Sequence, residues 1–549
     1  MTKATIATLL ATLAFMLSSH AAKQPNVLLI YGDDAGYGDL GIYGSINNLI
    51  KKTFLKLLIL MSCCPLLLSA ASNRPNIVVF LVDDMGLMDT SVPFLTDDQG
   101  EPKKYPLNDW YRTPHMEALA ANGIRFSNFY AQSVCSPTRA SIMTGQNATR
   151  HHTTNWIHTN RNNRGKYGPR KWNWEGLTKD SITLPRILQE NGYQTIFVGK
   201  GHFGHMRSEG ADPLNLGFDI NIGGSAIGHP GSYSGDYGQR GNHPVPGLEA
   251  YHNTGTFLTE ALTLEANKAV TAAIKKGPPF YLYLSHYAVH APFHTDPRFI
   301  EHYKGKKNGR APAYATLIEG MDKSLGDLVA HLQKLAVAED TLIFFLGDNG
   351  SDAPLGEKTG HTSSAPLRGK KSTMYEGGTR VPFIAAWAKP NPKSELQKQW
   401  RIPHGMIDPN NIGTVMDLYA TVLDAANAEN PSDHTIDGSS LKKLLTGQAD
   451  PDRRQEFLMH SPHDRGNAED DPGRNYYTSL RLGDWKLIYQ YFDETPYVLY
   501  NLKTDPFENH NLATEKPEKV QQLIGEMNQR LEAQDAQYPV KDGKEVKPQ

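Results

Sequence analysis

Cysteine is scarce in this sequence, with three residues in 549. Two of them, Cys63 and Cys64, lie within an apolar run near the start, so the rest of the chain holds a single thiol, Cys135. One thiol cannot form an internal disulfide, which excludes a disulfide framework as the source of stability. A hydrophobic core must stabilise the chain instead, and its length suffices for two or more domains of ordinary size.

Net charge is also nearly absent. Lys and Arg total 56 against 58 Asp and Glu, which gives a formal charge of −2. Proteins that bind nucleic acid or anionic membrane surfaces usually carry a clear excess of positive charge. We therefore expect no nucleic-acid partner, and nothing in the overall charge favours a membrane surface.

Two apolar runs near the N-terminus have the pattern of export signals, one in residues 1–22 and one in residues 51–71. The second run is near the lower length limit for a membrane span and contains Lys56 and Pro65, so we expect no stable span. Its sequence before Cys63 is also similar to a lipoprotein cleavage box. We predict an exported protein, periplasmic or extracellular, with a lipid anchor at Cys63 as an alternative.

A motif with a strand-like run followed by two aspartates occurs twice, at residues 25–36 and again at residues 75–86. The first copy runs almost directly into the second signal-like segment. The second copy is followed by a capped helix, a further strand and the single thiol. We therefore predict that residues 1–72 lie outside the folded body and that Asp83 and Asp84 are the functional acidic pair.

Predicted strands and helices alternate from residue 73 to about residue 445. Apolar or alternating runs predict strands at 76–82, 124–130, 195–198, 281–284 and 341–346. Helices are predicted at 113–122, 138–144, 184–191, 314–335 and 415–426. This order favours an α/β domain with a large mixed, mostly parallel sheet flanked by helices.

The pattern changes after residue 445. Short strands are predicted at 476–481, 485–491 and 497–501, followed by a helix at 517–533. We expect residues 446–549 to form a smaller α+β domain with an antiparallel sheet, beside a larger domain at 73–445.

The sequence around Cys135 is the most specific pattern in the chain. A proline follows two residues later, and a short helix is predicted up to Gly145. The thiol therefore lies at a helix N-terminus, where unpaired N–H groups favour negative charge, and Arg139 lies one turn further along. The pattern Cys-x-Pro-x-Arg-x-x-x-x-Thr-Gly resembles the sulfatase signature. The resemblance implies that a formylglycine-generating enzyme oxidises Cys135 to formylglycine, the nucleophile.

Two pairs of oxygen ligands follow predicted strands. Asp83 and Asp84 end one strand, and Asp348 and Asn349 end another. A set with carboxylate and amide oxygens alone suits a hard cation, calcium more readily than magnesium. Open α/β sheets place their sites at this end of the strands. The sulfatase resemblance implies that these four residues form the metal site.

Four further cationic side chains match sulfatase phrases. Lys200 and His202 stand in Gly-Lys-x-His-x-Gly, His290 stands in His-x-Pro, and Lys371 precedes Glu-Gly-Gly-Thr-Arg by five residues. By this resemblance Lys200 and His202, with the signature arginine, would hold the hydrated nucleophile and the sulfuryl oxygens. His290 and Lys371 would meet the leaving oxygen, with His290 as proton donor. The similarity covers about residues 74–513 and implies an alkaline phosphatase-like fold.

Residues 147–174 contain basic and aromatic side chains and no acidic residue until position 175. This segment is either a solvated loop or a rim that docks an anionic sugar chain by charge and stacking. We therefore expect a sulfated saccharide as substrate. Two other functions stay open: a phosphate or phosphonate monoester hydrolase of the same superfold, and a non-catalytic binder of sulfated glycans.

Overall fold

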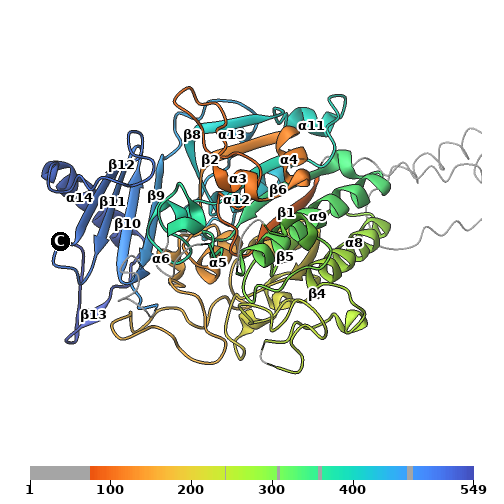
Figure 1. Cartoon of the computed structure of the whole chain (residues 1–549), viewed down its shortest axis with the longest axis horizontal. Coiled ribbons are helices and arrows are strands. Elements are labelled where there is room, and N and C mark those ends of the chain that lie inside the picture. The colour runs from red at the N-terminus through yellow and green to blue at the C-terminus, as the bar shows by residue number, and fades with distance from the viewer. Residues whose placement is uncertain (1–73, 242, 306–308, 356–360, 466–473) are drawn as a thin grey trace, which may run out of the picture. The chain divides into compact units, whose positions relative to one another are not determined.

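An eight-stranded sheet forms the centre of the larger part of the fold, in the order β4-β3-β5-β1-β6-β7-β2-β8 (Figure 1). Its strands are β1 (Asn76–Val82), β2 (Gly123–Tyr130), β3 (Gln194–Gly199), β4 (Ile220–Ile222), β5 (Phe280–His286), β6 (Thr341–Gly347), β7 (Phe383–Trp387) and β8 (Met406–Thr414). Seven of these strands run in one direction, and β7 runs antiparallel to both neighbours. The mixed, mostly parallel sheet is confirmed.

The computed structural model describes residues 74–241, 243–305, 309–355, 361–465 and 474–549. The predictions for residues 1–72, including both signal-like runs and the lipid anchor at Cys63, lie outside the described residues. In the part of the chain that the structure describes, no helix is both long and apolar enough to cross a membrane.

Strand β1 lies in the middle of the sheet, and helices cover both of its faces. On one face, Val78 and Phe80 pack in a cluster with residues of helices α4 (Pro114–Ala121), α8 (Leu258–Lys276) and α9 (Ala311–Lys334). On the other face, Ile77, Val79 and Leu81 pack with residues of α5 (Cys135–Thr144), α7 (Leu184–Glu190) and α12 (Asp417–Ala426). A strand buried on both sides explains its unbroken apolar sequence. The remaining short helices of this part are α3 (Pro106–Trp110), α6 (Ala148–His151), α10 (Glu376–Thr379), α11 (Glu395–Gln399) and α13 (Lys442–Leu445).

The C-terminal part contains an antiparallel four-stranded sheet in the order β12-β11-β10-β9. Its strands are β9 (Glu456–Ser461), β10 (Tyr477–Leu482), β11 (Trp485–Gln490) and β12 (Tyr497–Asn501), and helix α14 (Pro517–Ala533) follows. A short hairpin of β13 (Val540–Lys541) and β14 (Lys544–Glu545) ends the chain. Helix α14 covers one face of the sheet, whereas the other packs in a cluster with residues of the larger part, among them Tyr130 and Met416. The division into two domains at residue 445 stays a prediction, since Ser72–Gln549 is one compact unit.

Local details differ from the sequence predictions. Helix α5 begins at Cys135, so Pro137 is its third residue and not its first. Thr113 precedes α4 but makes no side-chain cap; its hydroxyl accepts a hydrogen bond from the Ser91 N–H instead. The sequence analysis also missed β7, β8, β9 and α8. Buried Leu258, Leu262, Ala266 and Ala269 of α8 recur at spacings of three and four, so its apolar periodicity was present in the sequence.

Candidate active site

Four neighbouring strands bring the predicted site residues to one edge of the sheet. Val82 at the end of β1 is level with His286 of β5 and Gly347 of β6, and Gly199 of β3 is level with Ser285. The residues that follow these strands therefore meet at the same height. They are Asp83 and Asp84 after β1, Lys200 and His202 after β3, His290 after β5, and Asp348 and Asn349 after β6.

Two carboxylates and two cations form a bonded cluster beneath this edge. The Lys200 ammonium donates to both oxygens of Asp83, at 2.8 and 2.7 Å. The Arg139 guanidinium donates to one oxygen of Asp348 from Nε and Nη2, at 3.0 and 2.8 Å. All four side chains are fully buried. Arg139 and Lys200 therefore orient the carboxylates, and neither lines the adjoining cavity.

Asp84 receives a second set of partners. Lys371 donates to its Oδ2 at 2.6 Å, the amide nitrogen of Asn349 donates to its Oδ1 at 2.9 Å, and Nε2 of His290 lies 3.5 Å from Oδ2. Its backbone has a φ of 61°, in the left-handed region that non-glycine residues seldom adopt. Such strain is often found at functional sites, and His202 shares it with the same φ.

Cys135 lies between the two sets. Its sulfur is within 4.8 Å of carboxylate oxygens of Asp83 and Asp348, and also within 4.8 Å of ligand atoms of Asp84 and His290. The side chain is 3% exposed and belongs to the first turn of α5, which follows β2 at the same edge of the sheet. Of the ten predicted site residues, the structure thus joins nine through these contacts. His202 is the tenth and lines the cavity beside Cys135.

Burial controls the ionisation of this centre. It raises the pKa of the Cys135 thiol to about 11, although Lys200 and Lys371 oppose the shift. Burial also acts to raise the pKa of Asp84, but the neighbouring His290 and Lys371 outweigh it and hold that pKa well below its usual range. The unmodified thiol is therefore neutral near pH 7, whereas Asp84 is ionised.

The acidic residues fit a divalent cation. Asp83, Asp84, Asp348 and Asn349 are each fully buried, and all offer oxygen. Among the described residues no donor reaches Oδ1 of Asn349, which leaves a buried carbonyl oxygen free to bind a cation. Three carboxylates and one amide suit calcium or magnesium better than a softer metal.

A cavity of about 400 Å³ opens beside Cys135. Its lining includes His202, His290 and Lys371, together with residues that the sequence analysis did not single out as site residues: His158, His229, His243, Asp352, Arg465 and Arg474. Nothing in the local sequence marks these residues, because they come from distant loops that only the fold brings together. The two arginines lie in the connection between β9 and β10, more than 300 residues beyond the thiol.

The basic and aromatic segment 147–174 has several structural roles. Arg150 pairs with Asp437 at 2.8 Å, and Trp172 is 4% exposed and donates to Asn162. Trp156, by contrast, is partly exposed and lines the cavity. Only part of the predicted rim therefore faces the site.

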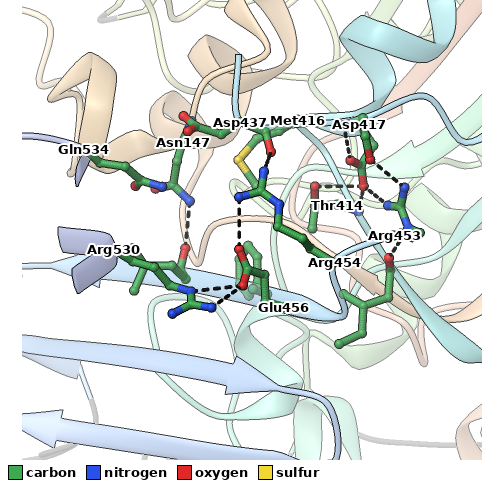
Figure 2. Close-up of a pocket in the computed structure, with 14 residues that line it drawn as sticks. Asn147, Thr414, Met416, Asp417, Asp437, Arg453, Arg454, Glu456, Arg530 and Gln534 are labelled. Atoms are coloured by element: carbon green, nitrogen blue, oxygen red, sulfur yellow. Dashed lines mark hydrogen bonds and ion pairs between the residues drawn. The ribbon is translucent and has the colours of Figure 1, made fainter. Parts of the chain in front are cut away.

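A second, much smaller pocket of about 40 Å³ lies between α12, β9 and α14 (Figure 2). Its polar side chains are bonded to one another: Arg453 to Asp417, and Arg530 to Glu456 at 2.6 Å. Its lining contains none of the predicted site residues. The residues that line this pocket come from both parts of the fold, and the ion pair between Arg453 and Asp417 links the two parts.

Comparison with known families fits this geometry. The family model "Sulfatase" matches residues 75–428, and the model "N-sulphoglucosamine sulphohydrolase, C-terminal" matches residues 369–537. The chain belongs to the sulfatase family. A curated relative, the N-acetylgalactosamine-6-sulfatase of Canis lupus familiaris, is 31% identical over 413 residues, which cover 72% of this chain and 71% of the relative.

Solved structures give the same fold for this sulfatase. The structure of Ps i-CgsB in complex with k-i-k-neocarrahexaose has a TM-score of 0.65 and 24% identity, and covers 83% of this chain and 93% of its own. The phosphonate monoester hydrolase SpPMH from Silicibacter pomeroyi has a TM-score of 0.55 and 19% identity, with 84% and 96% covered. The alkaline phosphatase-like fold and the sulfatase class of enzyme are confirmed.

Proposed function

We propose that this sulfatase releases inorganic sulfate from a sulfated carbohydrate through a formylglycine formed from Cys135. The observation that carries the proposal is the position of Cys135, at the start of a helix and within 4.8 Å of both sets of acidic residues. A buried thiol with a pKa of about 11 is a poor nucleophile near neutral pH. This supports the proposal that residue 135 acts as formylglycine and not as a thiol.

Asp83, Asp84, Asp348 and Asn349 would hold the cation, with calcium favoured and magnesium as the alternative. When bound there, a divalent cation supplies positive charge beside residue 135 and stabilises negative charge that develops on oxygen. Lys200 and Arg139 keep two of the carboxylates in position through the hydrogen bonds described above.

The aldehyde at residue 135 would be hydrated to a diol. One hydroxyl of the diol gives its proton to a neighbouring carboxylate and its oxygen attacks sulfur. The bond between sulfur and the sugar oxygen breaks, and that oxygen takes a proton from His290. His290 then takes the proton of the second hydroxyl, the carbonyl bond forms again, and the bond between the carbon and the sulfate oxygen breaks to release sulfate. Lys371 lies beside Asp84 at the cavity, where it can bind the leaving oxygen.

The protonation state of the His290 imidazole depends on whether substrate is bound. Burial lowers the pKa of His290 well below its usual range, despite the opposing charge of Asp84. An anion bound in the cavity favours the charged imidazole and raises this pKa again. His290 would therefore become a proton donor once a sulfate ester is bound.

A sulfated sugar is supported by the wall of the cavity and by the relatives. Trp156 and several histidines offer flat faces for a sugar ring, and the curated relative is named for the 6-sulfate of N-acetylgalactosamine. The fold is shared with a phosphonate monoester hydrolase, so hydrolysis of phosphate or phosphonate monoesters is the second candidate.

The test uses enzyme produced together with a formylglycine-generating enzyme. Mass spectrometry of the peptide with residue 135 should show the aldehyde or its hydrate, and the sample should release sulfate from defined sulfated saccharides. Cys135→Ala should lower turnover by about 10⁴-fold or more, as when a covalent nucleophile is removed. Full activity with an unmodified thiol would exclude the mechanism. Faster hydrolysis of an aryl phosphate than of the matching aryl sulfate would favour the second candidate.

We also propose that the protein is exported, on the basis of its two signal-like runs. N-terminal sequencing of the mature protein from the outer compartments of its source would locate the cleavage. Cleavage before Cys63 with a lipid on its sulfur would establish the anchored form.

A further inference from the structure

Two arginines from the C-terminal part line the same cavity as Cys135. Arg465 follows β9 and Arg474 precedes β10, so both come from a part of the chain that supplies none of the ten predicted site residues. The reaction proposed above gives neither of them a role. Their chemistry therefore bears on what else the substrate carries.

Arg465 is fixed in the wall of the cavity. Its Nη1 donates to the hydroxyl of Ser133 at 2.8 Å and to the carbonyl of Ser372 at 3.2 Å, and its Nε donates to Asn155 at 3.2 Å. Ser133 precedes Cys135 by two residues, and Ser372 follows Lys371. The guanidinium is thus held between the loop of the nucleophile and the loop of the active-site lysine.

Arg474 lines the cavity and has an unsatisfied donor. Its Nε is buried and finds no acceptor among the described residues. A buried N–H group without an acceptor is unfavourable, so a ligand oxygen that accepts a hydrogen bond from it would be stabilised.

Positive charge is also in excess on this wall. Burial lowers the pKa of Arg465, and the neighbouring charge of Arg474 lowers it further. The described lining contains one acidic side chain, Asp352, against these two guanidinium groups. An additional anion would relieve this imbalance.

The cavity has room for such a group. Its volume of about 400 Å³ lies within the range of about 300–1,000 Å³ typical of small-molecule sites. Trp156 lines the same cavity and offers an aromatic face to a sugar ring. A saccharide with its sulfate ester at residue 135 can therefore present other substituents to the wall that holds the arginines.

We propose that Arg474 and Arg465 form a subsite for a second oxyanion of the saccharide, either a carboxylate or another sulfate. The proposal rests on the sulfatase reaction described above and adds a requirement on the substrate. Guanidinium groups suit this role because they bind carboxylate and sulfate oxygens through paired N–H donors.

The test compares substrates with one and two oxyanions. The probes are N-acetylgalactosamine 6-sulfate, its 4,6-disulfate, and a uronic acid-containing disaccharide with the same 6-sulfate. Arg474→Gln should lower kcat/KM for the two dianionic probes by about 10- to 100-fold, mainly through KM, because a hydrogen bond between charged groups is lost. The effect on the monosulfate should stay below about threefold. A response to only one dianionic probe identifies whether the subsite binds carboxylate or sulfate.

Arg401→Gln is the matched control. Arg401 is exposed and precedes β8, so it lies at the opposite edge of the sheet. This variant should keep wild-type kinetics on all three probes. An equal loss on all probes in Arg474→Gln, or no loss on any, would overturn the subsite.

Binding to Cys135→Ala separates the subsite from the reaction. Calorimetry of Cys135→Ala should show that the two dianionic probes bind more tightly than the monosulfate. This preference should disappear in Cys135→Ala/Arg474→Gln. If the preference is present but the wild-type aldehyde enzyme releases no sulfate, the proposed reaction fails and the subsite stands. Turnover of all probes without any preference overturns the subsite and leaves the reaction in place.

Discussion

Two buried ionic clusters in this molecule have similar bonds and different surroundings. The first, called the catalytic cluster after the role proposed above, contains Asp83, Asp84, Asp348, Arg139, Lys200 and Lys371. The junction cluster contains Glu376, Glu508, Lys486, Arg380 and Arg481. In the first, Lys200 lies 2.7 Å from Asp83; in the second, Lys486 lies 2.8 Å from Glu508 and 3.0 Å from Glu376. Burial and short ion pairs therefore do not distinguish a site from a structural joint.

What distinguishes the clusters is access. The catalytic cluster adjoins a cavity of about 400 Å³. The junction cluster packs beside aromatic side chains of the C-terminal sheet, and Tyr130 donates to Glu376 at 2.6 Å. Perturbed ionisable groups indicate function only when a ligand can reach them.

The largest expected effect comes from the acidic pair of the catalytic cluster. Asp83→Asn/Asp84→Asn should remove the bound cation and lower turnover by about 10³-fold or more, because a cation in such a site stabilises the transition state by several kcal/mol. Elemental analysis gives the cation content per chain. Asp33→Asn/Asp34→Asn, in the first copy of the motif, should keep both cation and activity. Loss of the cation in this second variant alone would show that the first copy fills the central position of the sheet.

A change in the junction cluster should affect stability and leave cation binding intact. Glu376→Gln removes the carboxylate that Lys486 and Arg481 share, and leaving buried charges unpaired costs about 3–5 kcal/mol. Urea unfolding measures the cost, and elemental analysis should show an unchanged cation content.

The double variant Glu376→Gln/Lys486→Met tests the cause of that loss. It removes one partner from each side, so it should be less destabilised than the sum of the two single variants. Loss of the cation in Glu376→Gln, without loss of stability, would contradict the distinction between the clusters.

Most of the catalytic cluster could be predicted from the sequence because each pair of ligands follows a strand directly. Strands β1 and β6 are continuous apolar runs, and a parallel sheet brings their ends together. Arg465 and Arg474 could not be predicted in this way. They reach the cavity because β9 and β10 pack against the larger part of the fold, and this contact leaves no local pattern in the sequence.

The same limit applies to the sheet itself. Strand β7 is a five-residue run that reverses direction between β6 and β2, and its sequence carries no mark of that reversal. The start of α5 shows a smaller discrepancy. Proline is common in the first turn of helices, so a proline near a helix start fixes the boundary only to within a few residues.

Acid should destabilise the C-terminal part of the fold through His460. Burial lowers the pKa of His460 to about 4, and its ring nitrogens bond to Thr478 and to the carbonyl of Gln537. Between pH 6.5 and 4 the unfolded chain binds a proton that the folded chain does not. The free energy of unfolding therefore falls by about 1.4 kcal/mol for each unit by which the pH is lowered over this range.

His460→Gln should reduce that pH dependence. Urea unfolding of the variant and the wild type at pH 7, 6, 5 and 4 gives the difference curve, which removes the contributions of other titrating groups. Replacement of the exposed His404 by Gln is the control and should leave the curve unchanged. A difference that does not vary with pH would mean that His460 acts through packing alone.

The smallest expected effect is at Arg454, which Figure 2 shows beside Arg453. The Arg453 side chain is 2% exposed and pairs with Asp417, whereas the Arg454 side chain is 66% exposed and lies 3.4 Å from Glu456. Solvent screens the second pair, so Arg454→Gln should change the free energy of unfolding by less than about 1 kcal/mol. Arg453→Gln should cost about 3–5 kcal/mol, since Asp417 would stay buried without its partner. Equal costs for the two variants in urea unfolding would contradict the view that burial, and not the presence of an ion pair, sets the energy of these contacts.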